Sequence, residues 1–387
     1  MSRRAGATVL GVLGTAALVA ACSPSPEPGP GEAQAHTGSA EPTAASPAAP
    51  QSFSVVATGD VLIHPELTDQ AASDAEAAGN GGPDEFDYGP LLAGVKPLVS
   101  EADLALCHLE VPLARDGGTY AGYPQFIAPP ELAGDLAEVG YDGCSTASNH
   151  TLDHGAEGVV STLDALDEAG IEHTGSARGQ EEAATPLVYD VGGVAVGHVS
   201  YTFGFNGFEL PSDKPWLSNP LDADALVAEA EAAKEAGAEV VIASVHWGQE
   251  YVHEPTADQQ ALAERLATEE AIDLVIGHHA HVVQPIEKVG DTWVAWGLGN
   301  SIARHAEPKG VSEEGVAARF TFVREDGGWS VGKAEYVPTL VELGPPIRLV
   351  DLTTAEPTER RRQALERTDE IVLSRGGAED GLTRPGN

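Results

Sequence analysis

The segment Asp273–Gln284, DLVIGHHAHVVQ, places three histidines within four residues, directly after an apolar run that is typical of a buried strand. Imidazole rings are rarely crowded in this way unless a cation holds them neutral and ordered. Residues two apart in an extended segment share a face, so the spacing predicts that His279 and His281 point together while His278 faces the opposite way. The segment therefore predicts a metal site at the end of a strand.

The rest of the chain alternates short apolar runs with amphipathic helical patterns. Near-continuous apolar strands in such an alternation are typical of parallel sheets, so the predicted fold class is α/β, with antiparallel strands added. The expected strands are 53–59, 103–110, 171–175, the hairpin 186–202, 239–245, 273–277, 292–298 and 318–337. The expected helices are 90–100, 130–139, 155–169, 222–236, 257–270 and 356–373.

Polar side chains follow five of the strands at the point where each strand ends. In open α/β sheets ligands bind beyond the carboxyl ends of the strands, so we expect these side chains to converge. In chain order they are Asp60, His64, His108, Glu110, Asn149, His150, Asp153, His246, Glu250, His278, His279 and His281. Carboxylates, an amide and neutral imidazoles suit zinc, manganese or iron, whereas calcium prefers oxygen alone. The candidates exceed the four ligands of one structural site, which predicts two divalent metal ions.

Each of these residues taken alone has a simpler explanation. The alternatives are a loop or cap residue for Asp60, a surface histidine for His64, a hydrogen-bonded pair for His108 with Glu110, a helix cap for Asn149 or Asp153, and a core histidine for His246. The cluster that follows Gly277 is harder to explain structurally, and the joint pattern favours metal binding. Other histidines, His305 among them, are expected to be structural or solvated.

The charge balance limits the class of partner. Acidic residues outnumber basic ones by 60 to 21, which gives a formal net charge of -39. A nucleic acid would be repelled by such a surface and a basic footprint for it is absent from the sequence, so no nucleic-acid partner is expected. Hydrophobic residues make up 42% of the chain, which is enough for a core.

The N-terminus has the pattern of a targeting signal. MSRR is followed by the short apolar stretch 5–21, which ends in VAAC and resembles a bacterial lipobox with Cys22 as the lipidated residue. An ordinary secretory signal or an uncleaved anchor is the alternative. Residues 23–50 are rich in Pro, Ala and Ser and are expected to form a disordered tether. The predicted location is extracytoplasmic, on the outer face of the cell membrane, held there through lipidated Cys22.

Two further cysteines, Cys107 and Cys144, lie in apolar strand-like runs. A free buried thiol is the commonest outcome for such residues. A disulfide between them is compatible with a location outside the cytoplasm, and the sequence leaves both outcomes open.

Six motifs follow one another in a set order: TGDVLIH, ADLALCHLEVPL, ASNHTLDHG, HWGQEY, GHHAHVVQ and GLGNSI, within residues 52–302. In this order they resemble the CapA-type poly-γ-glutamate capsule synthesis proteins, which belong to the calcineurin-like metallophosphatase superfamily. The resemblance implies a four-layer α/β/β/α sandwich with mixed sheets and a two-metal centre at the strand ends. The implied ligands are Asp60, Glu110, Asn149, His246, His279 and His281. The resemblance also gives His150 the role of the proton-donating or phosphate-contacting histidine, which Asp153 would orient.

Two departures from the family pattern concern the first two motifs. The usual first motif is Asp-x-His, whereas His64 lies four residues after Asp60. The second motif is commonly Asn-x-Glu, and His108 replaces that Asn two residues before Glu110. We therefore keep His64 as a candidate ligand, and we expect secondary roles for three residues: His108, Glu250 and His278.

The expected function is that of a surface-anchored metal-dependent phosphoesterase linked to the synthesis of a capsule or cell-envelope polymer. A phosphoester or poly-γ-glutamate would be the substrate, and other capsule biosynthesis proteins the partners; the alternative is a non-catalytic metal-containing component that binds or exports the polymer. The predicted domain division is a signal at 1–22, a tether at 23–50, the metallophosphatase domain at 51–305, antiparallel strands completing it at 306–350, and a charged helix with a frayed tail at 351–387.

Overall fold

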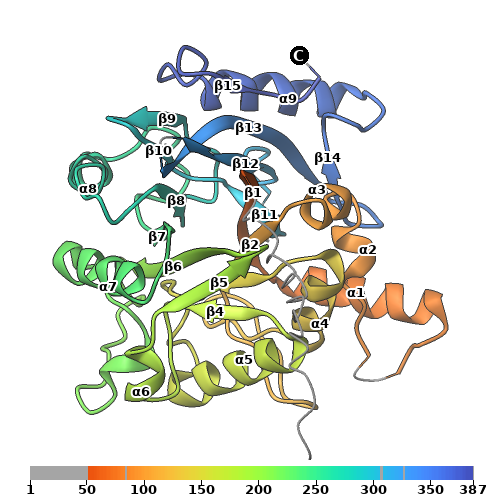
Figure 1. Ribbon diagram of the computed structural model, residues 1–387. Helices are drawn as coiled ribbons and strands as arrows, with labels where there is room; N and C mark the ends of the chain where they lie inside the picture. Colours follow the sequence, from red (N-terminus) through yellow and green to blue (C-terminus); the bar gives the residue numbers. More distant parts are fainter. Residues whose placement is uncertain (1–50, 83–84, 306–307, 326, 387) are drawn as a thin grey trace, which may run out of the picture. The chain divides into compact units, whose positions relative to one another are not determined.

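Strand β1 (Ser52–Leu62) lies at the centre of the larger sheet. It pairs in parallel with β2 (Leu104–Leu109) on one side. On the other side it pairs antiparallel with β12 (Glu314–Glu325), and its C-terminal end pairs in parallel with β11 (Asn300–Ala303). β1 is longer than the expected strand 53–59, so Asp60 lies within it. The computed structural model in Figure 1 describes residues 51–82, 85–305, 308–325 and 327–386.

The strands form two mixed sheets. The first has the order β14-β13-β12-β1-β2-β3-β4, with β11 beside β1 and β15 beside β13. The second has the order β5-β6-β7-β8-β10-β9, in which β6, β7, β8 and β10 run parallel. The remaining strands of the first sheet are β3 (Gly143–Ser145), β4 (Glu172–Thr174), β13 (Gly328–Glu342), β14 (Arg348–Asp351) and β15 (Leu382–Thr383). Those of the second sheet are β5 (Leu187–Val191), β6 (Val194–Thr202), β7 (Val240–His246), β8 (Leu274–His278), β9 (Ile286–Val289) and β10 (Thr292–Ala295).

The helices form the two outer layers of the fold. One hydrophobic cluster joins the two sheets, with Phe53 and Leu106 from the first and Val240 and Ile276 from the second. Another joins the first sheet to the helices between β1 and β4, and a third joins the second sheet to α7 and α8, which lie beside it in Figure 1. The predicted four-layer α/β/β/α arrangement is therefore confirmed. The principal helices are α1 (Pro65–Ala78), α4 (Glu131–Val139), α5 (Gly155–Ala169), α7 (Ala223–Glu235), α8 (Ala257–Leu266) and α9 (Glu359–Val372).

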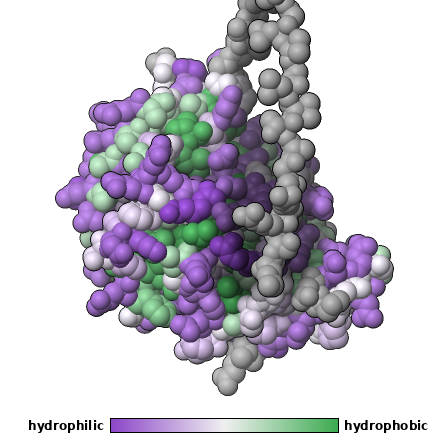
Figure 2. Space-filling view, turned by 90° about the horizontal axis from the view of Figure 1, so that it is seen from below, coloured by the Kyte–Doolittle hydropathy of each residue, from purple (hydrophilic) through white to green (hydrophobic). Residues whose placement is uncertain are grey.

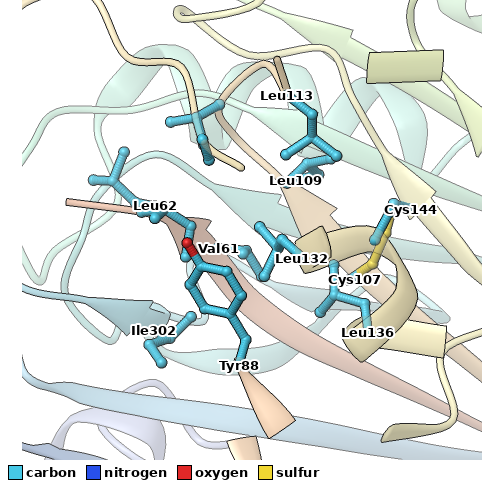
Figure 3. Close-up of a cluster of buried hydrophobic side chains, with 14 of the residues drawn as sticks. Val61, Leu62, Tyr88, Cys107, Leu109, Leu113, Leu132, Leu136, Cys144 and Ile302 are labelled. Carbon is cyan, nitrogen blue, oxygen red and sulfur yellow. A yellow bond between two sulfur atoms is a disulfide. The ribbon is translucent and has the colours of Figure 1, made fainter. Parts of the chain in front are cut away.

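The core under the first sheet brings together strand and helix side chains that are distant in sequence. Figure 3 shows Val61 of β1, Leu132 and Leu136 of α4, and Ile302 of β11 directed towards one another. Burying each such side chain contributes about 1.5–3 kcal/mol. At the edge of this core, Cys107 and its register partner Cys144 form a disulfide, which decides between the two outcomes that the sequence left open.

Helix α1 (Pro65–Ala78) was not predicted from the sequence, and the two short helices after it were predicted as one. The expected helix 90–100 is two short helices, α2 (Gly89–Leu92) and α3 (Lys96–Ser100). Helix α1 begins with Pro65, whose fixed φ suits a first turn, and ends at Gly79 in the left-handed conformation (φ 84°). Its buried face consists only of a leucine and two alanines, so its periodic apolar signal is weak.

The C-terminal segment packs against the first sheet. Helix α9 confirms the expected charged helix, and two of its arginines, Arg360 and Arg367, bind the buried carboxylate of Glu314. The tail was expected to be frayed. Its Leu382 is instead buried in the hydrophobic cluster between the sheets and pairs with β13, which holds this part of the tail in place. The domain division otherwise remains a prediction.

The surface of the described part is largely polar. Figure 2 shows hydrophilic residues over much of one face, with small hydrophobic patches between them. Among the described residues, no helix has both the length and the apolar character needed to cross a bilayer. The predicted lipidation site Cys22 and the tether lie outside the described residues.

Candidate metal centre

The position of Asp60 follows from a close approach of two backbone segments. The pairing of β1 with β2 shifts by one residue just before Asp60, which is the mark of a β-bulge. The backbone N–H of Asp60 donates to the carbonyl of Gly299 at 2.9 Å. A Cβ on Gly59 would lie 2.1 Å from that carbonyl oxygen, so only glycine fits there. The TGD and GLGN segments therefore meet, and the Asp60 side chain is buried beside them.

The carboxyl ends of strands from both sheets lie around Asp60. His108 is near the end of β2, His246 ends β7 and His278 ends β8. The two strands β7 and β8 are in register at His246 and His278, and β1 and β2 are in register at Asp60 and His108. The predicted convergence of polar residues at the strand ends is therefore present in the structure.

Three groups of side chains have the composition and spacing of metal ligands. Within each group the candidate ligand atoms lie within 4.8 Å of one another. The groups are Asp60 with His108 and His278, Asp60 with Glu110 and His281, and Glu250 with His279 and His281. Asp60 and His281 each belong to two groups, so the groups adjoin. We refer to them together as the three ligand groups.

The chemistry of these residues fits a divalent cation. Both carboxylate oxygens of Glu110 and the Nδ1 atom of His279 are buried with no hydrogen-bond partner among the described residues. The Nε2 atom of His281 lies 3.5 Å from Glu110 Oε1, too far for a good hydrogen bond. Two nitrogen or oxygen ligands of one cation, each bound at about 2.1 Å, lie roughly 3–3.5 Å apart. A buried carboxylate without a partner is costly, and a cation would remove that cost.

Most of the imidazoles are neutral and so have a lone pair available. Burial, together with the neighbouring His278, holds the pKa of His108 well below its ordinary value, and burial with His279 does the same for His246. Burial also lowers the pKa of His279 to about 3. Burial opposes ionisation of Asp60, but hydrogen bonds with His278 and His281 outweigh it and hold the pKa of Asp60 well below its usual range.

His281 differs from the other histidines because two carboxylates face it. Burial disfavours its charge, but Glu110 and Asp60 more than compensate and raise the pKa of His281 to about 10. Burial raises the pKa of Glu110 in turn. The pair therefore holds at least one proton at neutral pH, in the place where a cation would bind. A cation must displace that proton.

A chain of hydrogen bonds links the ligand groups to the loop after β3. Asn149 Oδ1 accepts from Nε2 of the neutral His246 at 3.0 Å, which leaves His246 Nδ1 to accept from His108 Nε2 at 2.9 Å. His108 Nδ1 then accepts from the hydroxyl of Ser145 at 2.8 Å. Both ring nitrogens of His108 are thus engaged, so it must release one of these bonds to ligate a cation. Asn149 and His246, which the sequence predicts as ligands, lie next to the three ligand groups.

The prediction that His278 faces away from the site is wrong. Its Nδ1 lies 3.0 Å from Asp60 Oδ1, and its ring stacks on His108 at 4.0 Å between centroids. The alternation rule fails because the segment after β8 is not extended: His279 and His281 have positive φ values of 90° and 53°. Residues other than glycine with positive φ have a strained backbone, and such strain is commonly retained at functional sites.

An open pocket of about 530 Å³ adjoins the ligand groups. His150, Glu250 and His281 line it. His150 Nδ1 donates to Asp153 Oδ2 at 2.7 Å, and Phe126 N donates to the same oxygen at 2.7 Å, so Asp153 fixes the ring and leaves Nε2 for the pocket. The predicted orientation of His150 by Asp153 is therefore present.

His64 and His305 form part of the wall of this pocket. Their ring centroids are 4.8 Å apart, and burial lowers the pKa of His64 to about 4. His64 belongs to none of the three ligand groups found among the described residues, so its role as a ligand remains a prediction. His305 was expected to be structural or solvated, but it lies 5.7 Å from the His281 ring. None of the expected strands ends beside it, because the short strand β11 was not predicted.

Asn300 is a site residue that the sequence analysis did not single out. Its Oδ1 accepts from His281 Nδ1 at 3.0 Å, while its Nδ2 donates to the carbonyl of Ser312 at 2.8 Å. Because Nδ1 carries the hydrogen, His281 presents Nε2 to Glu110 and the cation. The available signal was the GLGN segment, whose close contact with TGD places Asn300 beside Asp60.

We expect replacement of Asn300 by Leu to weaken binding of manganese about 10- to 100-fold, because His281 loses the acceptor that fixes its orientation. The affinity is measured by calorimetric titration of manganese into protein from which a chelator has removed the metal. Asn219→Leu is the matched control, since Asn219 bonds Ser200 and Glu229 away from the ligand groups. Equal affinities in the Asn300 variant and the unaltered protein would contradict this role.

Binding of manganese at pH 7.5 should release about one proton per His281 and Glu110 pair, since the pKa of His281 in the metal-free protein is about 10. The affinity for manganese should accordingly rise with pH up to about 10. At any pH below the raised pKa of His281, the proton competes with the cation for the site. Calorimetry in buffers of different ionisation enthalpy counts the protons. The His281→Gln variant should release fewer, and release of none by the unaltered protein would refute the assignment.

Comparisons with known proteins place the chain in a family. Residues 54–305 match the family described as "Bacterial capsule synthesis protein PGA_cap". The capsule biosynthesis protein CapA of Bacillus anthracis is 26% identical over 259 residues, which cover 65% of this chain and 61% of that protein. The PGA biosynthesis protein CapA of Bacillus subtilis is 29% identical over 169 residues, 43% of this chain and 44% of that protein. The chain thus spans between two fifths and two thirds of these relatives.

Among solved structures, the calcineurin-like phosphoesterase YfkN from Bacillus subtilis aligns with 14% identity, covering 82% of this chain and 97% of that chain, with a TM-score of 0.43. The family match covers well over half of the chain and contains every candidate ligand from Asp60 to His281. This chain therefore belongs to the bacterial capsule synthesis protein family known as PGA_cap.

Proposed function

We propose that this chain is a metal-dependent phosphoesterase with a dinuclear centre, acting in the synthesis of a capsule or cell-envelope polymer. One observation carries the proposal. Adjoining ligand groups that share Asp60 and His281 lie at an open pocket, which the oriented His150 also lines. A purely structural metal site would instead be closed, with every coordination position filled by a protein ligand.

The residues that would hold the cations are the members of the three ligand groups, with Asn149 and His246 beside them. Manganese, zinc and iron all suit this mixture of carboxylate, amide and imidazole. When bound, a pair of such cations supplies Lewis acidity towards phosphoryl oxygens and lowers the pKa of bound water towards about 7.

His150 would handle the proton of the leaving group. Hydrolysis breaks the bond between phosphorus and the ester oxygen, adds the hydroxyl of water to phosphorus and requires a proton on the departing alcohol. His150 Nε2 faces the pocket because Nδ1 is bound to Asp153, so a protonated ring can donate to that alcohol oxygen. Asp153, fixed by the backbone N–H of Phe126, keeps the ring in this orientation.

The proposed cellular role is supported by the family and by the N-terminal sequence pattern. The relatives are named for capsule biosynthesis and for biosynthesis of PGA. We place the protein at the outer face of the cell membrane, attached through lipidated Cys22, where other capsule biosynthesis proteins would be its partners. Poly-γ-glutamate or a phosphoester linked to polymer synthesis would be its substrate.

Substitution of His150 by Ala should lower kcat for phosphoester hydrolysis by about 10²- to 10⁴-fold, because general acid catalysis is lost. Metal content, measured by elemental analysis, should not change, since His150 belongs to none of the three ligand groups in the described part of the chain. Asp153→Asn should lower kcat by a smaller factor. His173→Ala is the control, because His173 pairs with Asp167 away from the ligand groups.

The alternative outcomes of this experiment separate the rival functions. Hydrolysis that persists in the His150 variant at the original rate would remove His150 from the mechanism. Stoichiometric metal with no turnover of phosphomonoesters, phosphodiesters or γ-glutamyl substrates would favour a non-catalytic component that binds or exports the polymer. Hydrolysis of γ-glutamyl bonds alone would replace the phosphoesterase by a peptidase-type activity.

A further inference from the structure

Two exposed aromatic side chains line the pocket, and a third lies beside His279. Among the described residues, the large hydrophobic side chains classed as exposed are Tyr123 (84% exposed), Phe203 (49%) and Phe208 (40%). Tyr123 and Phe208 line the pocket, and the ring of Phe203 lies 4.5 Å from that of His279. Elsewhere in the described chain, large apolar side chains are buried or only partly exposed. The position of Tyr123 and Phe208 in the pocket therefore calls for an explanation in terms of the site.

The loop that carries Tyr123 is firmly held. Ala121 and Ile127 exchange two backbone hydrogen bonds of 3.0 Å at its base. Phe126 is buried, and its N–H donates to Asp153. Tyr123, three residues before the buried Phe126, remains in solvent at the tip of the loop. The loop thus buries one aromatic ring in the core and presents another at the pocket.

The loop that carries Phe208 has the same design. Phe205 is buried in the core under the first sheet, and its carbonyl accepts from the N–H of Phe208 at 2.8 Å. Between them Asn206, with φ of 50°, accepts a hydrogen bond from Asn149 at 3.2 Å. Phe208 is again three residues from a buried ring and exposed at the pocket. Ordered loops therefore present both rings beside the residues that would bind phosphate.

The charges and amides of the pocket indicate what these rings bind. The described residues that line it include no lysine or arginine, whereas Glu250 is among them. Two cations contact its lining residues from outside this set: Lys309 lies over the face of Tyr251 at 4.3 Å, and Arg304 bonds the carbonyl of His305. Apart from the proposed cations, a polymer of carboxylates would find no lysine or arginine among these lining residues to pair with its repeated charges. Gln125 and Asn206 offer amides that can both donate and accept hydrogen bonds.

We infer that the substrate is a phosphoester whose alcohol part carries a ring, and that Tyr123 and Phe208 stack on this ring while the phosphoryl group lies at the ligand groups. This inference rests on the proposed phosphoesterase function and specifies its substrate class. Stacking on aromatic side chains needs a ring with a flat face, which both nucleosides and sugars supply. Acyclic alcohols and poly-γ-glutamate lack such a face.

The test uses the full chain loaded with manganese. Values of kcat/KM are measured for a nucleoside monophosphate and a hexose phosphate, and for the acyclic esters glycerol phosphate and phosphoserine. The ring compounds should be preferred, and Tyr123→Ala or Phe208→Ala should reduce that preference about tenfold through KM. The variants Tyr123→Phe and Phe208→Tyr, which keep an aromatic ring, should retain the preference for ring compounds. The better of the two ring compounds identifies a nucleosyl or a glycosyl substrate.

The outcomes distinguish this inference from the proposed function. Equal use of acyclic and ring esters, or an equal loss for both in the alanine variants, overturns the ring subsite and leaves the phosphoesterase standing. If no ester is hydrolysed, the phosphoesterase fails, and calorimetric binding of the same four compounds still tests the subsite. Tighter binding of the ring compounds that depends on Tyr123 and Phe208 supports it, and equal binding overturns it.

Discussion

The structure depends on the cost of burying carboxylates. Asp60 and Glu110 are almost fully buried, and an ionised carboxylate in such surroundings is stable only with a compensating charge or hydrogen bonds. Asp60 finds His278 and His281, whereas both oxygens of Glu110 lack a hydrogen-bond partner in the described part of the chain. Burial keeps His108, His246 and His279 neutral, so of these imidazoles only His281 offers a positive charge, and two carboxylates share it. Divalent cations would compensate them and use the free lone pairs at the same time.

The fold supplies this arrangement by bringing the carboxyl ends of strands from two sheets to one place. The bulge before Asp60 and the close contact of Gly59 with Gly299 fix the first carboxylate beside Asn300. Asn300 in turn is tied to the loop before β12 through Ser312. The segments beyond residue 305 thereby support the site, since β12 follows this loop and α9 binds Glu314 at the start of that strand.

Much of the site could be predicted from the sequence because its residues lie at the carboxyl ends of strands. Asp60, Glu110 and His281 follow apolar runs, and the carboxyl ends of parallel strands meet at one edge. The α/β class followed from the alternation of strands and helices, and the four-layer arrangement from the family resemblance of the ordered motifs. His278 was misplaced because the alternation of faces holds only in extended backbone, and two positive φ values interrupt it. Asn300 and the exposed rings depend on loop contacts between distant segments, which a single sequence does not reveal.

The most direct test of the central claim is the metal content of the protein purified without chelator, combined with anomalous diffraction from crystals grown in manganese. The account predicts about two cations per chain and two adjacent anomalous peaks in contact with Asp60, Glu110 and His281. A protein that binds no cation, with Glu110 protonated and no anomalous peak among these side chains, would contradict it.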